Sequence, residues 1–306
     1  MLQELDTFAQ AYGVIYNASP CEDERLAVSY GRIRSLGITT AVPLLAWLRT
    51  IDSEQLPLED HIRAVKATES WASRRAFVGS QTRGYGAHLS RVLRGAQQAH
   101  AGDLDIADAV EAGLQVGHLN WPSDDDVRSA FLRRRYCGTG GIRRERVHLL
   151  LSAIDERLRA DDPNEPPASI DYKNLQIEHV MPQKWKTHWP VTVKGGSIVT
   201  EDPDDPQWQS LFAKRNRAVD RIGNLTLVSQ SFNGTVSNLS WVVKMAAFQK
   251  QKSLVINYHI AQSESWDEAR IEQRAEFLAE IAVAIWPRPA DLGPVPASNS
   301  TDGPNT

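Results

Sequence analysis

The chain has 306 residues, of which 42% are hydrophobic and 24% are charged, so it is long enough for two globular domains and too apolar for wholesale disorder. It contains no uninterrupted apolar run of about 18 residues, and Glu4 and Asp6 stand where a signal peptide carries positive charge, so we expect neither a membrane-spanning nor a secreted protein. Its two cysteines, Cys21 and Cys137, are too few and too far apart for a disulfide framework or a Cys-rich zinc site, and the reducing cytoplasm is the expected compartment.

Residues 1–160 carry apolar side chains at steps of three and four, the spacing of amphipathic helices. Leu5, Phe8 and Tyr12 show it in the first segment, and Ile62 and Val65 show it again further along. Similar periods run through residues 62–77, 88–98, 106–119 and 147–158. We therefore predict an all-helical domain over residues 1–160.

The texture changes after a segment at residues 161–169 that is rich in proline and acidic residues and cannot continue a helix. Short β-prone runs follow at 175–180 and 222–228, and helical periods follow at 239–251 and 266–286. We read 161–169 as a linker, 170–287 as a second domain of mixed α and β structure, and the proline-rich residues 288–306 as a disordered tail. The predicted fold class is mainly α with a small α+β part.

Charge is distributed unevenly between these regions. The whole chain carries −4, but residues 171–260 contain eleven Lys and Arg against seven acids, which makes that segment +4 and leaves −8 elsewhere. Local positive charge indicates an anionic partner. Three lysines on or just after the helix predicted at 239–251 are candidates for phosphate contacts: Lys244, Lys250 and Lys252.

The string Glu178-His179-Val180-Met181-Pro182-Gln183 places a histidine and a carboxylate at the end of a β-prone run. Successive side chains of a strand point to opposite faces, so the two groups can divide their work. Imidazole is the side chain whose ordinary pKa lies nearest neutrality and can deprotonate water, while a carboxylate oxygen suits Mg²⁺. Downstream lie Gly223-Asn224-Leu225-Thr226-Leu227, Asn233, and Asn238, which we favour as the N-cap of the next helix.

These motifs resemble the C-terminal HNH nuclease domain of GmrSD-type, modification-dependent restriction enzymes. The resemblance extends over residues 60–287, because Trp71-Ala72-Ser73-Arg74-Arg75 resembles a helical-domain motif of that family and residues 266–287 resemble its closing helix. In the family, the HNH domain follows a helical region and an N-terminal nucleotide-hydrolysing sensor domain. The resemblance implies an HNH ββα-metal (His-Me finger) fold for the second domain.

The resemblance also implies a role for each matching residue. His179 corresponds to the general base, and Glu178 and Asn233 correspond to ligands of Mg²⁺ or Mn²⁺. Asn224 corresponds to a residue that supports the histidine loop, and both Asn224 and Asn233 belong with His179 in the catalytic set. An asparagine replaces the third histidine of a typical HNH triplet, and Glu178 stands where many relatives have Asp, so the ligand set departs from the family's usual pattern.

Six arginines crowd residues 133–146, here called the Arg-rich segment, with a glycine-rich turn between them. They are Arg133, Arg134, Arg135, Arg143, Arg144 and Arg146. Arginine clusters and exposed backbone N–H groups bind phosphates, but a solvated pair of salt-bridged helices has the same composition. The sequence leaves both interpretations open.

The resulting hypothesis is a Mg²⁺-dependent DNA endonuclease or nickase, the effector of a modification-sensing anti-phage system. Its partners would be double-stranded DNA and a sensor domain located in a longer chain or in a separate subunit, with no membrane. The alternatives are a catalytically idle DNA-binding module and an HNH ribonuclease, because the motif does not distinguish between the sugars.

Overall fold

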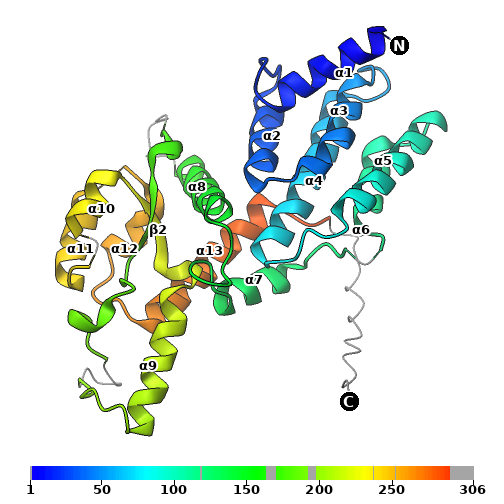
Figure 1. Cartoon of the computed structure of the whole chain (residues 1–306). Helices are drawn as coiled ribbons and strands as arrows, with labels where there is room; N and C mark the ends of the chain where they lie inside the picture. Colours follow the sequence, from blue (N-terminus) through cyan, green and yellow to red (C-terminus); the bar gives the residue numbers. More distant parts are fainter. Residues whose placement is uncertain are drawn as a thin grey trace, which may run out of the picture.

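The first half of the chain is a set of packed helices (Figure 1). The structure, a computed structural model, describes residues 2–117, 119–162, 170–191, 198–236, 238–251 and 253–289. The helices of this half are α1 (Leu2–Ile15), α2 (Glu24–Leu36), η1 (Thr39–Ala41), α3 (Val42–Thr50), α4 (Leu58–Phe77), α5 (Tyr85–Ala101), α6 (Ile106–Gln115), α7 (Asp124–Arg133) and α8 (Arg144–Asp161). The predicted helical character of residues 1–160 therefore agrees with the described structure.

Local sequence signals set several helix ends. Asp23 caps α2 by accepting hydrogen bonds from two backbone N–H groups, and Gly37 ends the same helix with a φ of 71° that favours glycine. Ser123 and Asp126 form a capping box at the start of α7. These contacts satisfy N–H and C=O groups that have no partner inside a helix.

Helix α4 is the central element of this half. It packs against α2, α3, α6, α7 and α8, and most of its residues are buried. A helix buried all around must also satisfy its polar side chains internally. Arg75 accordingly donates to Tyr85 and Asn120, while Arg74 donates to the carbonyls of Pro122 and Trp286.

The second half contains two strands, β1 (Gln176–His179) and β2 (Leu225–Val228), paired antiparallel with His179 opposite Leu225. The remaining elements are η2 (Tyr172–Asn174), η3 (Trp185–Thr187), α9 (Pro206–Val219), η4 (Ile222–Asn224), α10 (Gln230–Val236), α11 (Trp241–Lys250), η5 (Val255–Asn257), α12 (Tyr258–Ala261) and α13 (Glu268–Ile285). The prediction of a mainly helical chain with a small α+β part is confirmed at this level.

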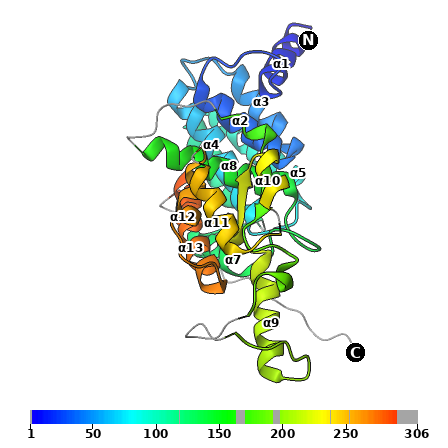
Figure 2. The same cartoon turned by 90° about the vertical axis from the view of Figure 1, so that its left-hand side faces the viewer.

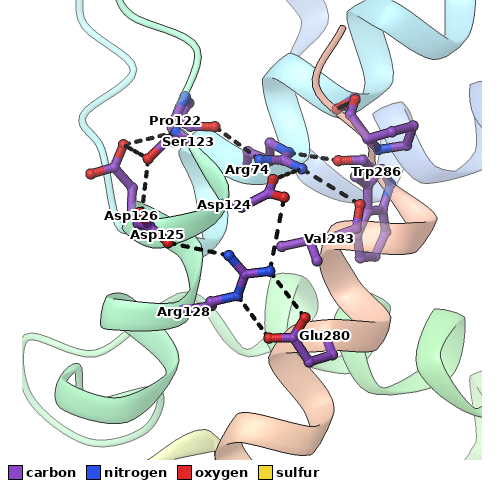
Figure 3. A network of polar contacts seen from close by, with 12 residues as sticks. Arg74, Pro122, Ser123, Asp124, Asp125, Asp126, Arg128, Glu280, Val283 and Trp286 are labelled. Carbon is purple, nitrogen blue, oxygen red and sulfur yellow. Dashed lines mark hydrogen bonds and ion pairs between the residues drawn. The ribbon is translucent and has the colours of Figure 1, made fainter. Parts of the chain in front are cut away.

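Helix α13 fastens the two halves to each other (Figure 3). Arg74 on α4 donates to the carbonyl of Trp286, 2.6 Å away, and forms an ion pair with Asp124 of α7 at 2.7 Å. Arg128 on α7 contacts Glu280 on α13 at 2.7 Å. The two segments that carry the family resemblance in the helical half and in the closing helix thus meet directly.

The main hydrophobic core crosses the predicted domain boundary. It runs from α1 through β2 to the end of α13, and a smaller core lies among η3, α9, α11 and the start of α13. Helix α9 extends away from the end of the molecule where α1 lies, as Figures 1 and 2 show. The domain limits at residues 160 and 170 stay a prediction, although helix α8 continues to Asp161.

One predicted feature differs from the structure, and others lie outside the described residues. Asn238 is exposed in a turn, and Ser240 occupies the N-cap of α11, so the prediction that Asn238 caps this helix is wrong. Residues 163–169 of the predicted linker and 290–306 of the predicted tail lie outside the described residues. No helix among the described residues is long and apolar enough to span a membrane.

Candidate active site

The end of strand β1 sends two neighbouring side chains in opposite directions. Glu178 contacts Lys244 of α11, and His179 contacts Asp220, the residue that ends α9. This is the alternation expected of a strand. The site therefore has two separate polar clusters, one on each face of β1.

His179 and Asp220 form the first cluster. The Nε2 atom of His179 lies 3.3 Å from Oδ1 of Asp220, and the His179 side chain retains 18% exposure, enough to meet a substrate. Asp220 is nearly buried, and it also accepts hydrogen bonds from Arg135 at 2.5 Å and Gln183 at 3.3 Å. Burial opposes ionisation of Asp220, but the hydrogen bonds from His179, Arg135 and Gln183 outweigh it and lower the pKa of this carboxyl to about 2.

Asp220 was absent from the sequence-based site. Its backbone carbonyl accepts a hydrogen bond from the N–H of Tyr136 at 2.7 Å, so the end of α9 docks directly on the Arg-rich segment. Arg135 and Asp220 are 85 positions apart, and no local pattern connects them. A catalytic histidine is commonly oriented by a third group such as a carboxylate, but the sequence does not indicate which acid takes that part.

Asn224 supports the histidine loop, residues 180–183, through hydrogen bonds of its side-chain amide. Its amide accepts a hydrogen bond from the N–H of Met181 and donates to the carbonyls of Met181 and Val219, each at 2.8 Å. Trp266 also donates to its Oδ1 atom. These contacts are those expected of a residue that supports the loop, while a part in the chemistry itself stays a prediction.

The glycine before Asn224 has a packing reason. A Cβ atom at Gly223 would lie 1.9 Å from the carbonyl oxygen of Ile271, because η4 runs directly against α13. Arg274 of α13 donates to the carbonyls of Gly223 and Leu225, and its burial lowers its pKa to about 9. The Gly-Asn pair is therefore set by close approach of two backbones as well as by the amide.

The second cluster differs from the sequence-based expectation. Lys244 is completely buried, its Nζ atom lies 2.6 Å from Oε1 of Glu178, and it donates to the carbonyl of His179 at 2.7 Å. Burial lowers the pKa of Lys244, and Glu178 opposes that shift. The structure thus corrects the assignment of Lys244 to DNA phosphates, since a buried, paired ammonium cannot reach them. Lys250 is exposed at the end of α11, and Lys252 lies outside the described residues.

Asn233 is half-buried on α10, the helix that follows β2. Its Nδ2 atom donates to Oε1 of Gln176 at 2.9 Å. Gln176 stands two residues before Glu178 on β1 and hence on the same face of the strand. The structure therefore places Asn233 over the Glu178 face of β1 and away from the face of the His179–Asp220 pair.

The Arg-rich segment divides into structural and exposed members. Arg135 holds Asp220, Arg146 donates to the carbonyl of Leu36, and Arg134 is half-buried against Gly79, where a Cβ atom would collide with its guanidinium group. Four members are exposed: Arg133, Arg135, Arg143 and Arg144, and of these Arg135 is the one paired with Asp220. Because Arg135 touches the carboxylate that orients His179, this segment lies next to the first cluster.

A strand-end histidine oriented by a carboxylate, with the exposed Arg135 bound to the same carboxylate, combines a positioned base with a positive charge that suits a phosphate-containing substrate. Residues 121–281 match the family described as GmrSD restriction endonucleases, C-terminal domain, and this match covers more than half of the chain. The protein belongs to the GmrSD restriction endonuclease family, which confirms the resemblance noted from the motifs. No match is found among curated proteins.

Proposed function

We propose that this protein hydrolyses phosphodiester bonds of DNA, with His179 as the general base, in a modification-sensing anti-phage restriction system of the cytoplasm. The observation that carries the proposal is the His179–Asp220 pair, 3.3 Å apart and reachable from solvent through the histidine. A base that is held by a third group is the recurring arrangement in hydrolytic sites. Membership of a restriction endonuclease family supports DNA as the polymer.

The contacts of His179 define which nitrogen accepts the proton. Ionised Asp220 can only accept hydrogen bonds, so Nε2 of His179 carries the hydrogen and Nδ1 keeps its lone pair. In the proposed reaction, Nδ1 takes a proton from water, the oxygen attacks phosphorus, and the bond from phosphorus to the leaving 3′ oxygen breaks as that oxygen gains a proton from solvent. Asp220 stabilises the imidazolium that forms.

We further infer that the second half is an HNH ββα unit. The antiparallel pair β1 and β2 is followed directly by α10, and Asn233 lies on that helix. Asn224 supports the loop after the catalytic histidine with hydrogen bonds at 2.8 Å. The order of elements and the position of each motif residue support this assignment.

The predicted Mg²⁺ or Mn²⁺ site does not fit one of the two ligands assigned from the sequence, Glu178. Glu178 already pairs with the buried ammonium of Lys244 at 2.6 Å, and among the described residues no group of three His, Cys, Asp or Glu could hold a metal ion. A dependence of cleavage on Mg²⁺ stays a prediction, which addition of EDTA to the assay below checks. The Glu178–Lys244 ion pair argues against Glu178 as a metal ligand and leaves the metal dependence of the reaction open to that test.

The proposal includes partners that the chain would need. The matched region is the C-terminal domain of its family, which supports an N-terminal sensor region supplied by a longer chain or by a separate subunit. Double-stranded DNA is the expected substrate, with the exposed arginines of the Arg-rich segment as its proposed contacts. Whether one site nicks DNA or two sites cut both strands is decided by the products of the same assay.

The decisive experiment incubates supercoiled plasmid with the full chain and compares wild type, His179→Ala and the control His188→Ala. His188 is exposed in the loop that follows η3, so its loss should leave cleavage unchanged. Removing a general base should slow cleavage by about 10² to 10⁴. DNA affinity should stay nearly the same, because one imidazole adds little to binding.

Four results would count against the proposal. Cleavage by His179→Ala at the wild-type rate would remove the histidine from the chemistry. Parallel loss of cleavage and DNA affinity would assign it to binding. Binding without any cleavage by wild type would favour an idle DNA-binding module, and cleavage of RNA in place of plasmid would favour a ribonuclease.

A further inference from the structure

The face of β1 opposite His179 carries a buried ion pair that the proposed reaction does not use. Oε1 of Glu178 lies 2.6 Å from Nζ of Lys244, and the Lys244 side chain has no solvent exposure. Glu178 is itself 7% exposed. A buried carboxylate without a counter-charge is strongly unfavourable, so this pair is neutral as a unit.

We propose that the ammonium of Lys244 is the resident cation of this face of the site and takes the place that a divalent metal ion bound to Glu178 would occupy. The inference concerns the same site as the proposed nuclease and rests on that proposal for its purpose. It assigns Lys244 as a positioning residue and removes Glu178 from the metal ligands.

The contacts of Lys244 support both parts of the assignment. Besides Glu178, its ammonium donates to the backbone carbonyl of His179 at 2.7 Å. It therefore holds the backbone of the residue whose ring is oriented from the other face by Asp220. Lys244 on α11 thus binds both the Glu178 carboxylate and the His179 carbonyl and so fixes the end of β1.

Electrostatics then excludes a second cation at the same carboxylate. Mg²⁺ binds oxygen ligands at about 2.0 to 2.1 Å, so an ion on Glu178 would stand close to the ammonium in a site that is nearly closed to water. Repulsion between like charges is strong where screening is weak. Binding of the metal would require Lys244 to leave a pocket in which Glu178 and the His179 carbonyl are its partners.

The test measures Mn²⁺ binding to the full chain by electron paramagnetic resonance, without any substrate. Glu178→Gln should leave the Mn²⁺ dissociation constant within twofold of wild type. Lys244→Ser removes the resident cation and leaves a buried carboxylate, so it should tighten Mn²⁺ binding at least tenfold. Adding Glu178→Gln to Lys244→Ser should abolish that gain, which assigns it to this carboxylate.

Two outcomes would overturn the proposal. Weakening of wild-type Mn²⁺ binding by tenfold or more in Glu178→Gln would make Glu178 a ligand, and a folded Lys244→Ser variant without any gain would show that the ammonium blocks nothing. If Lys244→Ser fails to fold, as judged by circular dichroism, the comparison of Glu178→Gln with wild type still decides. Glutamine keeps the size of Glu178 and an oxygen acceptor for Lys244.

A cleavage assay separates a positioning role from general stability. Lys244→Arg keeps a cation between Glu178 and the His179 carbonyl, and it should retain cleavage within about tenfold, whereas Lys244→Met at matched thermal stability should lose at least a hundredfold. Equal loss in both variants would contradict the positioning role. If wild type cleaves no DNA at all, the proposed function fails, while the Mn²⁺ comparison remains readable.

Discussion

Asn224 is the residue on which the position of the histidine loop depends most directly. It is completely buried, and its side chain takes part in four hydrogen bonds, with Met181 twice, Val219 and Trp266. Each buried hydrogen bond contributes about 1 kcal/mol, and a partner left without one costs more. The order of the loop that follows His179 therefore depends on the hydrogen bonds of this amide.

Replacement of Asn224 by Ala should lower the free energy of unfolding by about 3 kcal/mol, because it leaves buried donors and acceptors unpaired. Urea denaturation followed by circular dichroism measures the change. The control is Asn216→Ala, which removes a single hydrogen bond from Trp185 and should cost about 1 kcal/mol. Equal effects of the two substitutions would contradict the central role of Asn224.

Ionisation of Asp220 makes the free energy of unfolding depend on pH in the acidic range. Its pKa is lowered from 3.8 to about 2 in the folded chain, so its contribution to stability is fully present above about pH 4 and is lost as the pH falls toward about 2. In Asp220→Asn this contribution is absent at every pH. The difference in unfolding free energy between the two proteins should therefore be largest above about pH 4 and shrink on acidification. A difference that stays constant from pH 5 to pH 2 in urea titrations would refute the ion pair.

The Arg-rich segment is the element that joins the helical half to the site. Arg133, Arg143 and Arg144 are exposed, while Arg135, which is also exposed, is paired with Asp220 beside His179. The alternatives left open by its sequence thus apply to different members. Arg134, Arg135 and Arg146 make contacts within the protein, whereas Arg133, Arg143 and Arg144 remain available for phosphates.

Replacing Arg133, Arg143 and Arg144 by Gln should weaken DNA binding and make the slope of log K against log salt shallower by about 2.7, because each phosphate contact releases about 0.9 counterion. Cleavage at saturating DNA should stay nearly normal, since these residues position the substrate without touching the reacting phosphate. A matched triple change of exposed arginines elsewhere, Arg83, Arg91 and Arg94, should leave the slope unchanged. An unaltered slope in the first variant would assign the segment to another partner.

Across the whole molecule, the closing helix α13 makes the two halves a single packing unit. Trp286 is 1% exposed, its Nε1 atom donates to Glu69 at 2.7 Å, and its ring packs on Phe77. The core that contains it also contains Leu225 and Leu227 of β2. A substitution that weakens the packing of this end of α13 should therefore destabilise both the helical half and the strand pair.

We expect one cooperative thermal transition for the full chain and a loss of about 3 to 5 kcal/mol in Trp286→Ala, the usual cost of removing a buried tryptophan. Differential scanning calorimetry measures the first quantity and urea denaturation the second. Leu104→Ala, at a side chain that is 68% exposed, should change stability by less than about 0.5 kcal/mol. Two well-separated transitions would instead show that the halves fold independently.

Much of this molecule can be predicted from local patterns. Helical periodicity locates α1, α4, α5, α6 and α8 in the first half but not α2, α3 or α7. The motifs at 178–183 and 223–227 identify the family. The strand pair and the support of the histidine loop by Asn224 follow from the same motifs, because those residues belong to adjacent strands and turns. Asn224 and Met181 are 43 positions apart, so these two predictions rest on the family resemblance of the motifs and not on a local pattern.

The partners of the two site carboxylates depend instead on packing between distant elements. Asp220 reaches His179 across 41 positions, and Lys244 reaches Glu178 across 66, through the placement of α9 and α11 against β1. Lys250 is six residues from Lys244, about 240° around the helix, so one lysine is exposed while the other is buried. Which face of α11 turns inward is decided by the surfaces it packs against, and this is why the spacing of the lysines alone suggested DNA contacts for a residue that serves as an internal cation.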